Sequence, residues 1–525
     1  MSFLLKETIH QSLSSTLYNE VFSGRSTYHY FIGRILDWDN PSIPATPNAT
    51  GDYEYDTRNH IIATKKIKSN DCSLVIRRID WVSDTVYDQY DNNYSSDFLS
   101  DTGASSLKDA NFYVLNSDFN VYKCLFNNNG SASTEEPSGT DAIVVEYDDG
   151  YIWKYMYTIP LSSRNKFLTD SYMPVQTSIN SAFYSDGQID GVVIDNFGSG
   201  YTSANTTIIV EGDGINANLT PVINLAGEID DVIIENRGNG YTYANVTVDG
   251  DGENAAISIN LSTNDLNSVQ STVELAAVEG AIYALRLDNV GHGYNTTASI
   301  TVEGDGTGFA GNVILDNNVI SRIEVSNPGS GYTHANAIIT STYGSNGAVS
   351  AILSPFGGHG KNSVKELFAE AIMFYSTINN DKINSVIVDN DYRQFGIIKD
   401  IEQYDSAARF DESIGSPCTL VTVGSVGSLA DDTILVLDED HTKQFEVIET
   451  HVGSNQLLLG NLNNYTIADG TTFIDLSTGI TYIVQTIDAS PTINKFSGDL
   501  LYIDNRTAAR YSDNQIVTLR TVIKL

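Results

Sequence analysis

The sequence predicts a mainly β protein, and three observations support this fold class. Tyrosine and glycine are abundant, with 30 and 41 residues among 525, alongside many Asn, Asp, Ser and Thr residues. Aromatic and β-branched side chains suit a pleated, half-buried surface, and small polar residues suit the turns between strands. Apolar segments of strand length are bounded by turn residues, and one strand–turn–strand pattern recurs four times.

Length and charge limit the organisation and the partners of the chain. At 525 residues the chain is too long for one hydrophobic core, so we expect roughly three to four domains, or a few domains with large insertions. The 29 basic and 66 acidic residues give a net charge of -37. Because this charge repels a phosphate backbone, we do not expect nucleic acid as a partner.

The cysteines and the hydropathy pattern indicate where the chain folds. Cys72, Cys124 and Cys418 are widely spaced and have no histidine at zinc-finger distances, which favours reduced thiols over a disulfide framework or a metal site. The N-terminal segment becomes charged at Lys6 and Glu7 and resembles neither a signal peptide nor a membrane span. No segment approaches ~18 consecutive apolar residues. We therefore expect folding in a cytoplasm without membrane insertion.

Before the repeats, the sequence predicts one helix and several strands. Residues 5–22 place apolar side chains four apart, along one helical stripe. Residues 72–82 indicate a buried strand, and residues 112–128 indicate two strands around a polar turn. The alternation of aromatic and apolar residues over 149–160 is typical of another strand. Long loops connect these sheet elements.

Residues 179–353 contain four units, each with a strand, a Gly-x-Gly-Tyr turn and a second strand. The second glycines are spaced by 40, 53 and 38 residues, a period typical of a modular β array. Glycine allows positive φ, a preceding Asn or Asp can hydrogen-bond the turning backbone, and the tyrosine can pack across the base of the turn. We interpret the turns as structural and leave open a roll, a sandwich or separate hairpins. The turn residues are Gly198, Gly200, Tyr201, Gly238, Gly240, Tyr241, Gly291, Gly293, Tyr294, Gly329, Gly331 and Tyr332.

After the repeats, the sequence predicts a short helix and a second β module. Ser363 with Glu366 forms a capping-box signature. Short apolar segments with Gly/Asp turns over 411–495 indicate a small β module, and residues 496–525 indicate two closing strands. The apolar residues that follow the capping box at helical spacing are Val364, Leu367, Phe368, Ala371 and Ile372. The predicted boundaries are 1–178, 179–353, 354–410, 411–495 and 496–525.

Motifs for nucleotide binding or catalysis are weak. GTGFAG at 306–311 is followed by a strand-like segment, whereas a dinucleotide site requires a helix there. GGHGKN at 357–362 lacks the P-loop spacing. His359 is interpreted as a structural turn histidine, because no nucleophile with an acid partner lies near it in sequence. We therefore expect neither enzymatic activity nor a cofactor.

Acidic turns raise the possibility of calcium binding. Each turn offers few oxygens, whereas calcium takes six to eight, so solvated carboxylates are the favoured interpretation. Residues 438–449 space acids as an EF-hand loop does, but Lys443 stands where that loop needs glycine. The acidic turn residues are Glu211, Asp213, Asp249, Asp251, Glu303 and Asp305. We expect no resident metal.

Five motifs stand in one order along the chain: YHYFIGRILDW at 28–38, VIRRIDW at 75–81, VYKCLFNN at 121–128, DGYIWKYMYTIP at 149–160 and FSGDLLYIDNR at 496–506. Together they resemble the baseplate wedge protein of T-even-type contractile-tail bacteriophages, the gene product eight family. GGHG with VKELF at 357–368 and DNDYRQFGIIKD at 389–400 are similar to segments of wedge proteins from related marine phages. Relative to that family, 179–353 and about 411–495 are insertions.

The resemblance implies a non-enzymatic structural subunit with a layered β-sandwich core and short loop helices. It implies a homodimer that docks other baseplate wedge proteins in the virion tail baseplate, after assembly in the host cytoplasm. The inserted repeats are expected to decorate the wedge or to contact a tail-fibre or peripheral baseplate protein. An alternative is a tail protein that binds or depolymerises host-surface carbohydrate through the aromatic and acidic turns of the repeats.

Arginine and aromatic residues of the matching segments are candidates for the core or for its contacts. Interface cores favour Tyr, Trp and Arg, whereas a tryptophan in a strand is more often a core residue, so the sequence leaves the two roles open. Arg77, Arg78 and Asp80 are expected to form a buried ion-pair cluster beside Trp81. The candidates are Arg34, Trp38, Arg77, Arg78, Trp81, Tyr151, Trp153, His359 and Arg506.

Overall fold

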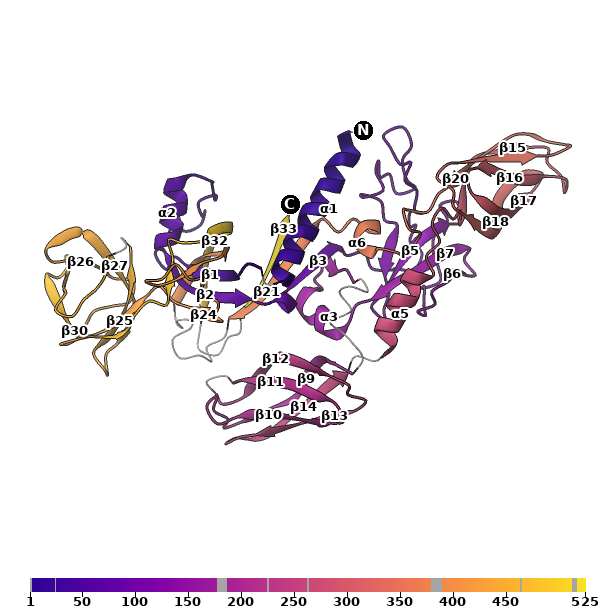
Figure 1. Ribbon diagram of the computed structural model, residues 1–525. Helices are drawn as coiled ribbons and strands as arrows, with labels where there is room; N and C mark the ends of the chain where they lie inside the picture. The colour runs from indigo at the N-terminus through magenta and orange to yellow at the C-terminus, as the bar shows by residue number, and fades with distance from the viewer. Residues whose placement is uncertain are drawn as a thin grey trace.

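The computed structural model is mainly β and consists of a central core from which three β modules project (Figure 1). In Figure 1 a barrel lies at one end of the core, the second repeat module lies at the other end, and the first repeat module lies below. None of the helices in the described part of the chain has the length and apolar character needed to cross a bilayer. The structure describes residues 2–23, 25–176, 187–223, 226–261, 264–378, 390–462, 465–511 and 517–525.

Two sheets of the core combine strands that are far apart in sequence. The first sheet has the order β24 (Ile414–Gly415), β2 (Ile61–Ile67), β1 (Tyr28–Gly33), β22 (Asn390–Lys399) and β32 (Asp499–Tyr511). The second has the order β33 (Val517–Lys524), β21 (Ala371–Ile378), β3 (Cys72–Arg77) and β8 (Tyr172–Pro174). Both sheets are antiparallel. The segments before, between and after the inserted modules therefore form one body.

A third sheet completes the core. Its order is β4 (Tyr113–Leu115), β5 (Asn120–Asn127), β7 (Tyr151–Thr158) and β6 (Val144–Glu146). All positions of β1 and β5 are buried, which is typical of strands covered on both faces. The remaining core elements are α1 (Ser2–Ser23), α2 (Gly51–Asn59), η1 (Ser69–Asp71), α3 (Leu161–Phe167), α6 (Ser363–Glu366), β23 (Glu402–Gln403) and β31 (Ile493–Asn494).

The first repeat module contains two Gly-x-Gly-Tyr units that share their sheets. β9 of the first unit pairs with β14 of the second, β10 pairs with β13, and β11 pairs with β12. The module therefore has an approximate twofold symmetry in its pairing, and neither unit has a complete sheet of its own. The strands are β9 (Ile189–Ser199), β10 (Thr207–Gly212), β11 (Ile215–Ile223), β12 (Ile229–Asn239), β13 (Ala244–Asp249) and β14 (Glu253–Leu261).

The second repeat module contains the third and fourth units and repeats this pairing. β15 pairs with β20, β16 with β19, and β17 with β18. The predicted repeat region thus consists of two closed pairs, separated by α5 (Asn264–Leu275), which contacts β7 of the core. The strands are β15 (Ala284–His292), β16 (Ser299–Gly304), β17 (Thr307–Asp316), β18 (Val319–Ser330), β19 (Ala335–Thr340) and β20 (Ser345–Ile352).

The second predicted insertion is a closed six-stranded barrel. Its interior is filled by side chains such as Val421, Leu435, Phe445, Leu459 and Phe473, which are fully buried. The strand order is β25 (Thr419–Val423), β28 (Gln456–Asn461), β27 (Asp440–His451), β26 (Ile434–Leu437), β29 (Thr472–Asp475) and β30 (Ile480–Ala489). The EF-hand-like spacing at 438–449 therefore falls in the β26–β27 hairpin.

The predicted amphipathic helix after residue 363 is wrong beyond its first turn. α6 ends at Glu366, and its N-cap is Asn362 rather than Ser363, because the Asn362 side chain accepts the backbone N–H of Lys365. Ala371 and Ile372 lie in β21, opposite β3. The chain leaves helical geometry at Phe368, whose φ is 56°, and the buried Glu366 side chain pairs with Lys123. The predicted strand over 72–82 also ends early, at Arg77.

Candidate functional site

The four Gly-x-Gly-Tyr turns are built for tight chain reversal. The first glycine of each turn has a φ between 60° and 67°, which favours glycine over residues with a Cβ. A Cβ at Gly238 would lie 2.7 Å from the Ile215 carbonyl oxygen and 2.6 Å from the Tyr241 ring. The second glycines have similar φ values of 75° to 79°, but a Cβ there would meet nothing closer than 3.5 Å. The positive φ favours glycine at both positions, but only the first position lacks the space for a Cβ.

An asparagine two residues before each first glycine closes the turn, as the sequence predicted. Its side-chain oxygen accepts the glycine N–H at 2.9 to 3.1 Å. The asparagines are Asn196, Asn236, Asn289 and Asn327.

The tyrosine of each turn packs on a glycine of the other unit in the same module. The Tyr241 ring lies over Gly214, and the Tyr201 ring lies over Gly252, where a Cβ would come within 2.4 Å of either ring. In the second module Tyr332 covers Gly306 and Tyr294 covers Gly344. The four tyrosines are 4% to 6% exposed, so they are core residues of the modules. Each ring covers a turn glycine of the other unit in its module. We therefore assign a structural role to these turns.

The acidic turns hold the opposite unit through threonine. Asp251 accepts the backbone N–H and the hydroxyl of Thr202 at 2.8 and 2.6 Å. Asp213 binds Thr242 in the same way, and Asp305 binds Thr333. The hydroxyl hydrogen bond from Thr202 is the main cause that lowers the pKa of Asp251 to about 2. These carboxylates are thus engaged within the module.

The described residues contain no cluster of three or more His, Cys, Asp or Glu side chains that could hold a metal ion.

The third unit departs from the threonine–aspartate pattern. Asn295 stands where the other units have threonine, and no aspartate stands in the TSTYGS turn opposite it. Both members of the pair are therefore replaced together.

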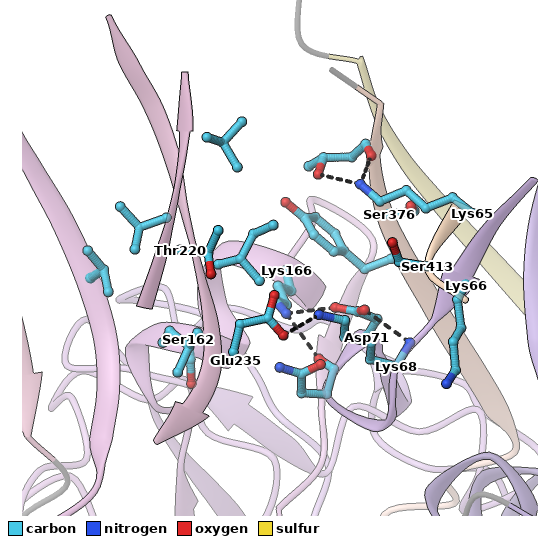
Figure 2. Close-up of a pocket in the computed structure, with 18 of the residues that line it drawn as sticks. Lys65, Lys66, Lys68, Asp71, Ser162, Lys166, Thr220, Glu235, Ser376 and Ser413 are labelled. Atoms are coloured by element: carbon cyan, nitrogen blue, oxygen red, sulfur yellow. Dashed lines mark hydrogen bonds and ion pairs between the residues drawn. The ribbon is translucent and has the colours of Figure 1, made fainter. Parts of the chain in front are cut away.

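A groove separates the core from the first repeat module and has a volume of about 660 Å³ (Figure 2). The core side presents Lys65, Lys66, Lys68 and Lys166, and the module side presents Arg237. Among the residues that the structure describes, three acidic side chains line the groove: Asp71, Glu235 and Asp411. This excess of basic residues contrasts with the whole chain, which has 66 acidic and 29 basic residues.

Ion pairs organise the groove. Lys66 pairs with Asp411 at 2.8 Å and Lys166 pairs with Asp71 at 2.8 Å. Lys68 reaches across the groove to Glu235 of β12 at 2.9 Å, as Figure 2 shows. Lys65 donates to the Thr377 backbone carbonyl. Sequence analysis missed this site because its basic side chains come from three separate segments of the chain, at residues 65–68, 166 and 237.

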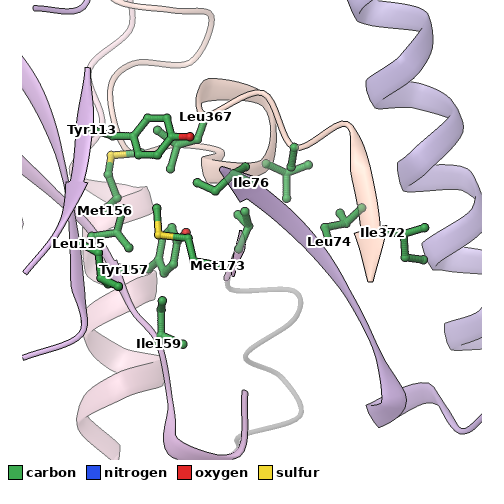
Figure 3. Close-up of a cluster of buried hydrophobic side chains, with 14 of the residues drawn as sticks. Leu74, Ile76, Tyr113, Leu115, Met156, Tyr157, Ile159, Met173, Leu367 and Ile372 are labelled. Atoms are coloured by element: carbon green, nitrogen blue, oxygen red, sulfur yellow. The ribbon is translucent and has the colours of Figure 1, made fainter. Parts of the chain in front are cut away.

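The tyrosine and tryptophan of the 149–160 motif belong to the core. Tyr151 and Trp153 are at most 1% exposed, and their rings stack 5.5 Å apart. Tyr157 and Ile159 point from the same segment into the main hydrophobic cluster, with Ile76 of β3 (Figure 3). β7 is therefore buried on both faces, so these residues serve packing within the chain.

Trp38 and the arginines near it also make internal contacts. The Trp38 indole N–H donates to the Arg506 carbonyl at 2.9 Å, and the Arg34 guanidinium lies 4.0 Å from the Trp38 ring centroid. Arg34 also pairs with Asp56 at 3.0 Å. The Arg506 side chain is 58% exposed and pairs with Asp504. Trp38 thus ties β32 to the loop that follows β1.

The predicted buried cluster of Arg77, Arg78 and Asp80 is wrong. Arg77 is exposed and donates to the side chain of Asn111 and to backbone carbonyls of the neighbouring loop. Arg78 pairs with Asp80 at 2.8 Å, with side chains 25% and 50% exposed. The cluster is open because β3 ends at Arg77, before the sheet can cover these side chains. Trp81 is partly buried and donates to the Ser133 hydroxyl.

His359 belongs to a buried group that sequence analysis did not find. Lys123 of β5 pairs with Glu366 at 2.6 Å, and both side chains are at most 2% exposed. Glu366 also accepts the backbone N–H groups of Gly360 and Asn362. The His359 ring meets the Tyr90 ring edge-on, with centroids 4.9 Å apart.

This group fixes the loop before β21 to the third sheet. Burial, together with the positive charges of Lys123 and Lys154, holds the pKa of His359 well below its usual value of 6.5. Burial also lowers the pKa of Lys154 to about 8. His359 is thus neutral in the folded protein at pH 7 and acts as a packed ring.

No protein-family model matches the chain, and no curated protein matches its sequence.

The two glycines of one turn provide a matched stability test. Gly240→Ala should cost about 1 kcal/mol, because only the left-handed conformation opposes the methyl group. Gly238→Ala should cost about 3 kcal/mol or more, because the methyl group also overlaps backbone atoms of β11. Hydrogen exchange of amides in β9 to β14 of the full chain measures both opening free energies. Equal losses in the two variants would contradict the steric role of the first glycine.

His359 should make the core sensitive to acid. The folded-state pKa lies below 6.5, so the unfolded chain binds more protons at low pH, and stability falls as pH drops below about 6.5. His359→Phe should reduce the stability loss between pH 7 and pH 5, by at most about 2 kcal/mol over the 1.5 pH units below 6.5. Denaturant unfolding followed by tryptophan fluorescence measures this, since Trp38, Trp81 and Trp153 all lie in the core. The exposed His441 of the barrel supplies the control, His441→Phe; a matching shift in both variants would refute the assignment.

Proposed function

We propose that the chain is a structural subunit of the baseplate wedge of a contractile-tail bacteriophage. In this role it forms a homodimer, docks other wedge proteins and transmits the rearrangement that accompanies tail contraction. It is placed in the virion tail baseplate after assembly in the host cytoplasm. The inserted repeats of 179–353 contact tail-fibre or peripheral baseplate proteins.

The observation that carries this proposal is the way the inserted modules leave the core intact. The segments that resemble wedge proteins lie in strands of one body, and Tyr151 and Trp153 of the 149–160 motif are buried there. Each inserted module has a separate hydrophobic cluster. Such an arrangement supports a scaffold that holds several surfaces at fixed positions, as an assembly subunit requires.

A carbohydrate-binding or depolymerising tail protein is the second candidate. Two exposed aromatic side chains of the repeat modules favour it: Tyr243 is 59% exposed and Tyr343 is 61% exposed. Aromatic faces at a surface suit stacking on sugar rings. Against this role, Asp213, Asp251 and Asp305 in the acidic turns are hydrogen-bonded to threonines of the same module.

Immunogold electron microscopy of the phage particle that contains this chain tests the proposal directly. An antibody against the chain should label the baseplate, and the purified protein should sediment as a dimer. The purified protein should release no reducing sugar from host polysaccharide. Label elsewhere on the particle would contradict the wedge role. Sugar release that is lost in Asp213→Asn but kept in Asp440→Asn, on a barrel turn, would favour the second candidate.

A further inference from the structure

The groove between the core and the first repeat module has a surface chemistry unlike the rest of the chain. Of the side chains in the described part of the chain, five basic and three acidic ones line it, whereas acidic residues outnumber basic residues 66 to 29 in the whole chain. We propose that this groove binds an extended acidic peptide segment of a neighbouring protein. Assigning the peptide to a neighbouring subunit rests on the proposed function, but the binding itself does not.

Charge complementarity favours an acidic ligand at this place. Lys65, Lys66, Lys68 and Lys166 approach from the core, and Arg237 approaches from the opposite wall. Three of the lysines already contact carboxylates of the same chain, so these internal carboxylates mark positions that an acidic side chain can occupy. The Lys66–Asp411 and Lys68–Glu235 pairs have side chains that are 28% to 71% exposed. Exposed ion pairs are weak, typically below ~1 kcal/mol, so a ligand carboxylate can exchange with these two.

The size of the charge excess favours a short peptide over a long polyanion. The described lining of the groove carries two more basic than acidic side chains, and the whole chain carries a net charge of -37. A nucleic acid or a sulfated glycan extends beyond the groove and would meet the repulsive surface around it. A peptide segment of a few residues stays within the groove.

The walls also suit an extended backbone with alternating side chains. The module wall presents Pro221, Val222 and Ile233 as an apolar surface opposite the lysines. On the core wall, β3 begins at Cys72 opposite Phe374, whereas β21 continues beyond Phe374 to Ile378 alongside β33. An extended segment therefore lies between the cationic core wall and a module wall on which these apolar residues stand beside Arg237 and Glu235, which matches a peptide whose acidic and aliphatic residues alternate.

The ion pairs that line the groove offer a matched pair of variants. Lys66→Gln with Lys68→Gln removes two positive charges, and Asp411→Asn with Glu235→Gln removes the carboxylates from the same two ion pairs. Both double variants break the same contacts and should perturb the fold alike. Only their effect on the charge of the groove differs in sign.

Fluorescence anisotropy of a labelled peptide of about ten alternating glutamate and valine residues measures binding to the full chain at low salt. We expect the lysine variant to bind at least tenfold more weakly and the carboxylate variant to bind several-fold more tightly than the unmodified chain. Lys365→Gln, an exposed lysine outside the groove, should leave binding unchanged. A peptide of alternating lysine and valine should not bind.

Several outcomes would overturn the proposal. The proposal is wrong if the acidic peptide does not bind, or if both double variants bind it more weakly than the unmodified chain. It is also wrong if heparin oligosaccharide or polyphosphate displaces the peptide at a lower concentration than unlabelled peptide does. Self-association that masks the groove, detected as a concentration-dependent mass lost in the lysine variant, would assign the groove to a second copy of the chain instead. Peptide binding without baseplate labelling would retain the groove and reject only the wedge function.

Discussion

The packing of a tyrosine ring on a glycine of the neighbouring unit is the interaction on which the repeat modules depend. Tyr241 covers Gly214 of the preceding unit, and Tyr201 covers Gly252 of the following unit, so each unit closes the other. A side chain at either glycine would occupy the space of the ring, which is why the two residue types occur together. A buried tyrosine contributes a large apolar area, so the exchange of rings stabilises the pair over a single unit. Strand pairing between the two units also stabilises the pair over a single unit.

The pairs explain how large insertions leave the core undisturbed. In each module the strands of the two units hydrogen-bond to one another, and their apolar side chains are buried between the units. Such a module needs no packing from the core and can be attached through a short linker. The core, in turn, holds itself together across the insertions: Lys123 and Glu366 form a buried ion pair although 243 residues separate them. Removing either Lys123 or Glu366 would leave the other as a buried charge without its partner, which is strongly unfavourable. The core segments before and after the repeat modules, 1–178 and 354–410, are therefore fixed to each other by this ion pair as well as by sheet pairing.

Local features of the fold could be predicted from sequence, and long-range features could not. The strands, the glycine turns and the asparagines that cap them follow from short patterns, because the forces that shape them act over a few residues. The 53-residue spacing between the second and third turns was a signal that the units form two pairs. The burial of Arg77 and the helix beyond Glu366 were predicted wrongly, since β3 ends at Arg77 and the chain enters β21 at Ala371. The lysine groove left no local pattern, because Lys66 and Arg237 come from different bodies.

Hydrogen exchange on a Tyr241→Ala variant of the full chain tests most directly whether two units form one cooperative module. Tyr241 belongs to the second unit, but its ring covers Gly214 of the first. The reciprocal packing predicts faster exchange in β10 and β11 of the first unit as well as in β12 to β14, with β15 to β20 unchanged. Faster exchange confined to β12 to β14 would show that the units fold independently and would contradict the account.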